Sequence, residues 1–102
     1  MSLSNRQLRH LRGLTHHLKP VVMVGDKGLS ENVMAEIETA LNHHELIKVK
    51  LRGDRETRST WADEIARRFS AEPVHSIGQV ACFFRRNREK PVIVLPGESA
   101  KG

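Results

Sequence analysis

A length of 102 residues is typical of a single domain, and we expect one domain over residues 1–96 and a short flexible tail over residues 97–102. The absence of a long apolar run and of a charged-then-apolar start argues against a membrane span and a signal peptide. The lone cysteine, Cys82, excludes an internal disulfide and fits a cytoplasmic location. A net charge of +5 and a pI near 10.0 favour polyanionic partners, of which nucleic acid is expected before an anionic membrane.

The first expected element is a helix. Ser4 followed by Gln7 has the form of a capping box, and leucines then recur at helical spacing until Lys19-Pro20 ends the helix. The next element is a strand over residues 21–24, whose continuous apolar run suits burial on both faces. A glycine loop, Gly25-Asp26-Lys27-Gly28, follows it directly.

Ser30 is a suitable N-cap for a second helix, which should end near His43-His44. Residues 46–51 alternate between apolar and polar, which predicts a strand with one solvated face that carries Lys48 and Lys50. Asp54 is a plausible cap for a third helix running to about residue 70.

Near the C-terminus, residues 74–84 predict a strand with an irregularity at Gly78, residues 85–90 a turn, and residues 92–95 a last strand. The order α-β-α-β-α-β-β places the chain in the α/β (α+β) class. Strand-helix-strand units favour parallel pairing and the final hairpin adds an antiparallel strand, so we expect a mixed four-stranded sheet packed with three helices.

The charges are segregated along these elements. Residues 1–20 contain four Lys or Arg and no acid, residues 48–58 contain five against two acids, and residues 85–90 contain four against one. Residues 30–45 contain four glutamates and no Lys or Arg: Glu31, Glu36, Glu38 and Glu45. This segregation predicts a basic binding side and an acidic, solvated side.

The glycine loop joins a strand to the N-terminus of a helix, where unpaired N–H groups and the helix dipole suit an anion. Glycine at both ends would let a phosphate approach the backbone, although a bare G-x-x-G pattern also describes an ordinary tight turn. The residues after Gly28, Leu29-Ser30, do not continue as a P-loop, and no third glycine supports a dinucleotide fold.

Residues 20–30 and 44–50, together with the leucine-rich opening over residues 3–18 and the closing hairpin expected over residues 77–95, resemble the CRM domain, named for chloroplast RNA splicing and ribosome maturation. The resemblance implies a fold similar to the C-terminal domain of translation initiation factor three. It implies a stand-alone bacterial member associated with precursors of the large ribosomal subunit, whereas plant members with several such domains assist group II intron splicing. It also implies RNA contact by Gly25, Lys27 and Gly28, with Asp26 standing where some relatives have a basic residue.

Other chemistry finds little support in the sequence. The six histidines lack the spacing of a zinc site, Cys82 lies in an apolar strand segment, and the acids have no obvious partner base. With one Trp, three Phe and no Tyr, a sheet that stacks bases on aromatic side chains is not expected, and core packing is the default for Trp61 and Phe69.

We therefore predict a monomeric RNA-binding module without catalytic residues, cofactor or metal, bound to large-subunit ribosomal RNA and potentially in contact with ribosomal proteins. Two other classes stay open: a protein-interaction module that docks on an acidic or ribosomal protein, and a phosphate-ester enzyme that uses the loop. The expected RNA-binding residues are the glycine loop and the basic side chains around it: Gly25, Asp26, Lys27, Gly28, Arg6, Arg9, Lys48, Lys50, Arg52, Arg55 and Arg58.

Overall fold

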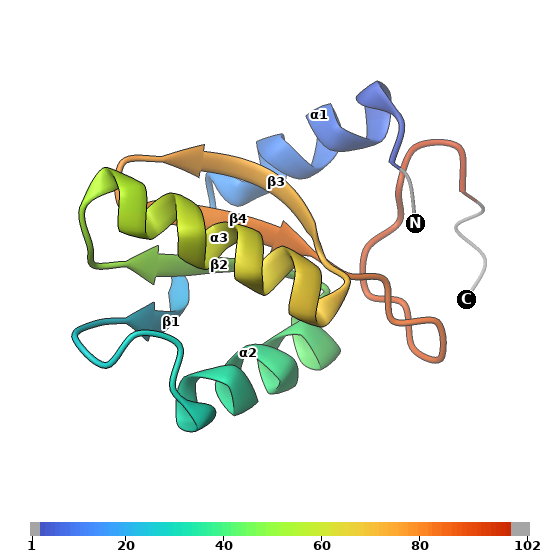
Figure 1. Ribbon diagram of the computed structural model, residues 1–102. Helices are drawn as coiled ribbons and strands as arrows, with labels where there is room; N and C mark the ends of the chain where they lie inside the picture. The colour runs from blue at the N-terminus through green and yellow to red at the C-terminus, as the bar shows by residue number, and fades with distance from the viewer. Residues whose placement is uncertain (1–2, 99–102) are drawn as a thin grey trace.

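Three helices and four strands follow one another in the computed structural model, which describes residues 3–98 (Figure 1). In chain order they are α1 (Asn5–Thr15), β1 (Pro20–Val24), α2 (Glu31–His44), β2 (Leu46–Leu51), α3 (Arg55–Phe69), β3 (Glu72–Ile77) and β4 (Val80–Phe84). The predicted order of elements is confirmed.

Each helix begins at the cap that the sequence predicts. Ser4 and Gln7 form a reciprocal capping box, in which each backbone N–H donates to the other side chain at 3.1 Å. The Ser30 hydroxyl accepts from Val33 N at 3.3 Å, and the Asp54 carboxylate accepts from Thr57 N at 2.8 Å. These bonds satisfy N–H groups that a helix leaves open at its first turn, and so they fix where α1, α2 and α3 start.

The strands form one mixed sheet in the order β1-β2-β4-β3. β1 pairs with β2 in parallel, and β4 pairs antiparallel with both β2 and β3. The parallel pairing predicted for the first strand-helix-strand unit is therefore confirmed. In the second unit β2 and β3 run in the same direction, but β4 lies between them.

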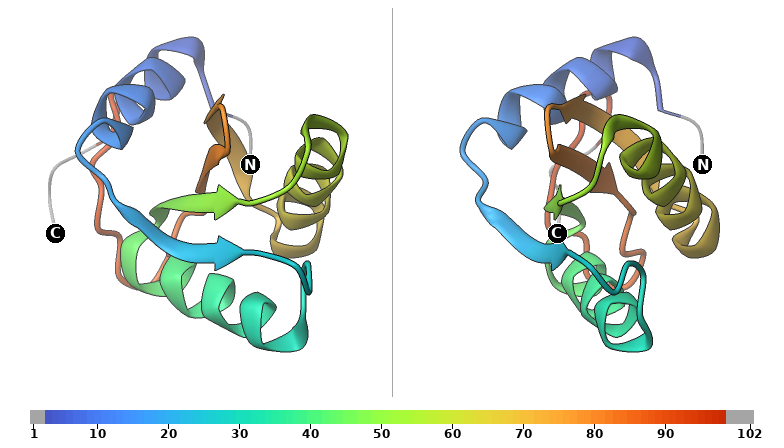
Figure 2. Two further views of the ribbon diagram at one scale, coloured as in Figure 1. Left: turned by 90° about the vertical axis from the view of Figure 1, so that its left-hand side faces the viewer. Right: turned by 60° about the vertical axis from the view of Figure 1, so that its left-hand side comes forward.

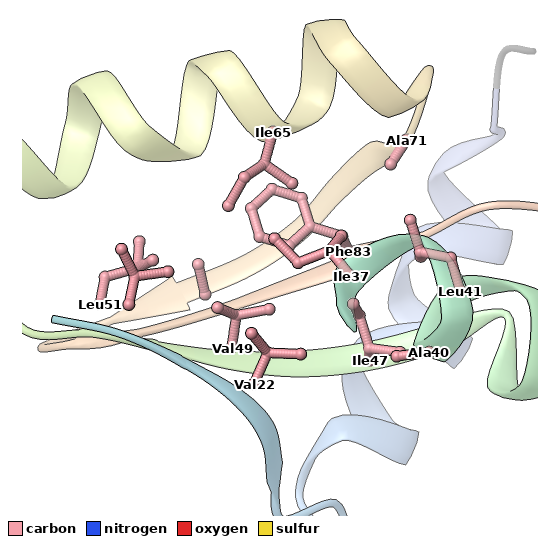
Figure 3. Close-up of a cluster of buried hydrophobic side chains, with 12 residues drawn as sticks. Val22, Ile37, Ala40, Leu41, Ile47, Val49, Leu51, Ile65, Ala71 and Phe83 are labelled. Carbon is pink, nitrogen blue, oxygen red and sulfur yellow. The ribbon is translucent and has the colours of Figure 1, made fainter. Parts of the chain in front are cut away.

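The helices cover the two faces of the sheet unequally (Figure 2). On one face α2 and α3 enclose the larger core cluster, in which Ile37 and Ile65 pack on Val49 and Phe83 (Figure 3). On the other face α1 covers a smaller cluster in which Leu11 packs with Leu46 and Phe84. Because adjacent strand residues point to opposite faces, Phe83 and Phe84 belong to different clusters, and both are 1% exposed.

The C-terminal strands differ from the prediction. Residues 74–84 are not one strand: the chain reverses at Gly78-Gln79, where Gly78 has a φ of +56°, and Ile77 pairs with Val80. The segment predicted as a last strand, residues 92–95, has no regular secondary structure and belongs to no sheet. The N–H groups of Val92 and Ile93 donate to a carboxylate oxygen of Glu45, at 2.8 Å each, so a side chain holds the segment.

The prediction that the first strand is buried on both faces is wrong. β1 is an edge strand, with Val22 and Val24 under α2 but Met23 about half exposed on the other face. Val21, where the register shifts, is also about half exposed and lies beside α2. Continuous apolar runs are typical of central strands, whereas here the run lies at the edge of the sheet. Of the predicted tail, residues 99–102 lie outside the described residues, and Glu98 N donates to Leu95 O at 2.9 Å.

Candidate nucleic-acid interface

The glycine loop Gly25–Gly28 leaves the carboxyl end of β1 and leads into α2. Gly28 N donates to Gly25 O at 2.8 Å, which closes a tight turn, and Gly28 has a φ of +63°, in the region that favours glycine. Gly25 is different: its φ is not positive, and a Cβ built on it would meet no heavy atom within 4 Å. Gly28 is thus required by the turn, while Gly25 leaves an open patch of backbone.

Trp61, on α3, packs against two loops at once. A Cβ on Gly28 would lie 3.4 Å from Trp61 Nε1, and a Cβ on Gly53 would lie 3.0 Å from Trp61 Cζ3. The indole therefore supports both the glycine loop and the connection from β2 to α3. The sequence analysis assigned Trp61 only to core packing, and its half-buried ring does pack against the larger cluster, but its position between the two glycines could not be predicted from its helical spacing.

Arg52 joins the glycine loop to the end of β2. Its backbone N–H donates to Val24 O at 2.8 Å, and its guanidinium Nη1 lies 3.9 Å from the sulfur of Met23. A cleft of about 390 Å³ opens here, lined by Met23, Gly25, Asp26, Arg52, Gly53 and Gln79. The structure thus brings together three predicted site residues, Gly25, Asp26 and Arg52, while Lys27 is exposed in the same loop.

Arg55 and Arg58 lie at the start of α3, beside a second cleft of about 390 Å³ against the turn at Gly78. Arg58 Nη1 donates to Gly53 O at 2.7 Å, so this side chain helps to hold the connection that precedes α3. Hydrogen bonds from the backbone and side chain of Thr57 lower the pKa of Asp54, the cap of the same helix. Arg55 is exposed and available to a ligand.

The remaining predicted residues lie farther away. Lys48 and Lys50 are half-buried on β2, on the face opposite α2 and α3, as the alternation predicts. Arg6 and Arg9 are exposed on the first turns of α1, beside Gln7, which donates to Pro96 O at 3.2 Å. This is the opposite end of the sheet from the glycine loop (Figure 1), so the structure does not bring Arg6 and Arg9 to the loop.

The basic side chains divide into two groups. In the part of the chain that the structure describes, ion pairs form between Arg85 and Glu38, between Arg86 and both Glu45 and Glu98, and between Glu64 and its neighbours Arg67 and Arg68. None of these pairs involves a predicted site residue. The basic run over residues 85–90 is therefore partly neutralised inside the protein, whereas the cations around the glycine loop form no ion pair among residues 3–98.

Glu45 is the main correction to the sequence analysis, which placed it on an acidic solvated side. It is fully buried, and its carboxylate accepts from Arg86 Nη1 at 3.0 Å and from Asn87 N at 2.6 Å, besides the two N–H groups of residues 92 and 93. Burial alone would raise its pKa, but these hydrogen bonds outweigh burial and lower it. Its partners lie 41 or more positions along the chain, so no local signal could reveal them.

Other reactive groups do not form a second site. Cys82 is buried in the smaller cluster, and burial raises the pKa of its thiol. Across residues 3–98 no three His, Cys, Asp or Glu side chains gather in a way that could hold a metal ion. No helix among the described elements has both the length and the apolarity to cross a membrane.

Comparison with known proteins gives a consistent result. A family model described as the CRS1 / YhbY (CRM) domain matches residues 3–85. An RNA-binding protein of Haemophilus influenzae is 50% identical over 92 residues, covering 89% of this chain and 93% of that protein. Proteins named as probable RNA-binding proteins are 44% identical in Pseudomonas aeruginosa, over 85% of both chains, and 33% identical in Bacillus subtilis, over 92% of this chain and 99% of the relative.

The fold has a counterpart among solved structures. The solution structure of a Staphylococcus aureus protein, described as a candidate RNA-binding protein, superposes with a TM-score of 0.79. The two sequences are 30% identical, and the match covers 93% of this chain and 100% of that one. The shared architecture therefore extends over nearly all of the described chain.

Proposed function

Because the chain belongs to the CRS1 / YhbY (CRM) domain family, we propose that it is a single-domain RNA-binding protein whose glycine loop and surrounding basic side chains hold the phosphate backbone. The observation that carries this proposal is the set of unpaired cations around an open loop. Lys27, Arg52 and Arg55 are exposed, and no described acid pairs with them, while Gly25 leaves its backbone accessible. Relatives named as RNA-binding proteins support the same choice of ligand.

The loop supplies geometry rather than most of the charge. The open backbone at Gly25 would let a phosphate approach the turn, and the α2 N-terminus behind it favours an anion. Asp26 offsets the charge of Lys27 within the loop, so Arg52 and Arg55 would contribute much of the attraction. Lys48 and Lys50 would extend this surface along β2, and Arg58 would act mainly by holding Gly53. Arg6 and Arg9 would contact RNA only if it continued to the far end of the sheet.

For the RNA itself we propose ribosomal RNA in precursors of the large subunit, bound by a cytoplasmic, monomeric protein that assists ribosome assembly without catalysing a reaction. The support is the resemblance of this chain to stand-alone bacterial members of the family. Crosslinking in cells followed by sequencing of the attached RNA tests the target. Enrichment of large-subunit ribosomal RNA is the expected result, and a flat background would contradict it.

A charge reversal tests the loop directly. Lys27→Glu should weaken binding to a fragment of large-subunit ribosomal RNA about tenfold and reduce the slope of log affinity against log salt by about 0.7 to 0.9 for the lost phosphate contact. The measurement is fluorescence anisotropy over roughly 50 to 200 mM salt. Lys90→Glu is the matched control, since Lys90 is exposed near the opposite end and undergoes the same change in charge.

Equal losses in the two variants would mean that only net charge matters, and the loop would then have no special role. No loss in either variant would contradict the proposed site. Affinity for cell extract that survives ribonuclease treatment would favour the protein-interaction alternative.

A further inference from the structure

Half of one sheet face has no helix over it. The strand register places one residue from each strand in a single row across this face, since Met23 pairs with Lys50, Lys50 with Val80, and Val80 with Ile77. The next residue of β2 on the same face is Lys48, which pairs with Pro20 of β1. The register shifts between Pro20 and Val22, and Val21 lies at the sheet edge beside α2. At spacings of about 4.8 Å between strands, the row is about 14 Å wide.

This row is open because α1 reaches only the other half of the face. Leu11 of α1 packs over Leu46, Phe84 and Val74, which lie toward the opposite end of the strands. At the two ends of the row, on the edge strands β1 and β3, the large apolar side chains of Met23 and Ile77 are 51% and 67% exposed.

The open row is basic as well as apolar, and it adjoins the glycine loop. Lys48 and Lys50 lie on it, and neither forms an ion pair with any residue from 3 to 98. Met23 belongs both to the row and to the cleft that Gly25 and Arg52 line. A ligand held at the glycine loop could therefore continue onto the sheet without leaving the protein surface.

We propose that this open sheet face, defined by Met23, Lys48, Lys50, Ile77 and Val80, binds unpaired nucleotides of the RNA whose backbone the glycine loop holds. The inference rests on the proposed function and adds the class of RNA: a structured element with a single-stranded extension. A duplex hides its base faces in the stack and offers only phosphate and sugar, so it gains little from exposed Met, Val and Ile side chains. Splayed-out bases can cover these side chains while Lys48 and Lys50 meet the phosphates.

An acidic protein segment could also meet an apolar and basic surface. RNA is favoured because the row and the glycine cleft share Met23 and so can bind one continuous ligand.

The row contains no aromatic side chain, and this limits the affinity that a single-stranded extension can add. Base stacking on aromatic rings is stronger than contact with aliphatic groups, so the gain from an extension should be modest.

The test uses two RNA hairpins with the same stem, one blunt and one with a short single-stranded 3′ extension. The wild-type protein should bind the extended hairpin about fivefold more tightly in fluorescence anisotropy. Ile77→Ser should lose most of that gain and bind the blunt hairpin as the wild type does, because Ile77 lies on the row but does not line the glycine cleft. Val92→Ser is the matched control, because Val92 is similarly exposed, at 58% against 67% for Ile77, and lies outside the row.

The outcomes separate the two proposals. Equal wild-type affinity for the two hairpins, or an equal loss for both in Ile77→Ser, overturns the sheet site and favours a protein partner. If Lys27→Glu binds both hairpins as tightly as the wild type, the glycine-loop proposal has failed instead. A thermal melt of each variant confirms that the exposed substitutions leave the fold intact.

Discussion

The two ends of the sheet use basic side chains in opposite ways. At the anchor end, which comprises Glu45, Arg85, Arg86 and residues 87–98, arginines are drawn into the structure. Arg86 lies between Glu45 and Glu98, and it also donates to Ile93 O at 2.8 Å. The loop end comprises the glycine loop, residues 52–54 and the turn at Gly78. Here Lys27, Arg52 and the adjacent Arg55 stay exposed.

This difference teaches that a count of charges along the chain does not locate a binding surface. The runs at residues 48–58 and 85–90 are similarly basic in sequence, yet ion pairs take up Arg85 and Arg86 of the second run, whereas no Lys or Arg of the first run forms an ion pair among residues 3–98. At the anchor end, the buried carboxylate of Glu45 and the backbone carbonyl of Ile93 accept hydrogen bonds from the guanidinium of Arg86. Charges left without partners are those that can exchange water and counterions for phosphate.

The largest effect should come from breaking the anchor end. Glu45→Gln removes a buried negative charge that faces Arg86 and the N–H groups of the C-terminal segment, and the variant leaves Arg86 with Glu98 as its remaining ion-pair partner among the described residues. We expect the free energy of unfolding to fall by about 3 kcal/mol, as is typical when one partner of a buried pair is lost. Urea denaturation measures this change, and RNA affinity below the unfolding transition should stay at the wild-type value.

The same variant should remove part of the pH dependence of stability. The pKa of Glu45 is lowered in the folded protein, so its contribution is fully present above the pKa of an unfolded-chain glutamate and is lost as pH falls through the lower folded value. The difference between wild type and Glu45→Gln should therefore shrink with increasing acidity. Glu89→Gln, at an exposed acid of the same segment, should show no such difference. A constant difference over the acid range would contradict the role assigned to Glu45.

Much of the fold could be predicted because its signals are local. Three caps, the alternation in β2 and the order of elements depend on residues a few positions apart, and each is confirmed. The hairpin was misplaced because Gly78 was interpreted as an irregularity within one strand. Its positive φ, which reverses the chain, is visible only in the structure.

The candidate site was harder to predict, because its parts are brought together by contacts between residues that are far apart in the sequence. The glycine loop could be singled out from its own sequence, but the support from Trp61, more than thirty positions later, could not. The sequence also gave no reason to separate Arg6 and Arg9 from Arg52, or to expect Arg58 to hold Gly53. Which charges gather depends on how the strands pair, and that pairing is set by nonlocal packing.

A smaller effect should come from the packing that supports the loop end. Gly53→Ala places a Cβ 3.0 Å from the Trp61 ring and 3.1 Å from Thr57 Cγ2, so the connection before α3 must shift. We expect a loss of about 1 to 2 kcal/mol in the free energy of unfolding. Trp61→Leu removes most of the clash, so the double variant should be more stable than the sum of the single losses predicts. Strictly additive losses in urea denaturation would mean that the indole does not support Gly53.

The smallest change in stability should come from Gly25→Ala. This variant tests ligand contact at the loop end separately from the stability of the fold. A Cβ at this position meets nothing within 4 Å, so the free energy of unfolding should change by less than about 0.5 kcal/mol. If a phosphate approaches this backbone, the added methyl should weaken RNA binding about fivefold, or ~1 kcal/mol. Gly13→Ala on α1 is the matched control, because its Cβ is equally unobstructed, and it should leave RNA affinity unchanged. An unchanged affinity for Gly25→Ala would show that the ligand does not touch this backbone, and the difference between the two ends would then be one of charge alone.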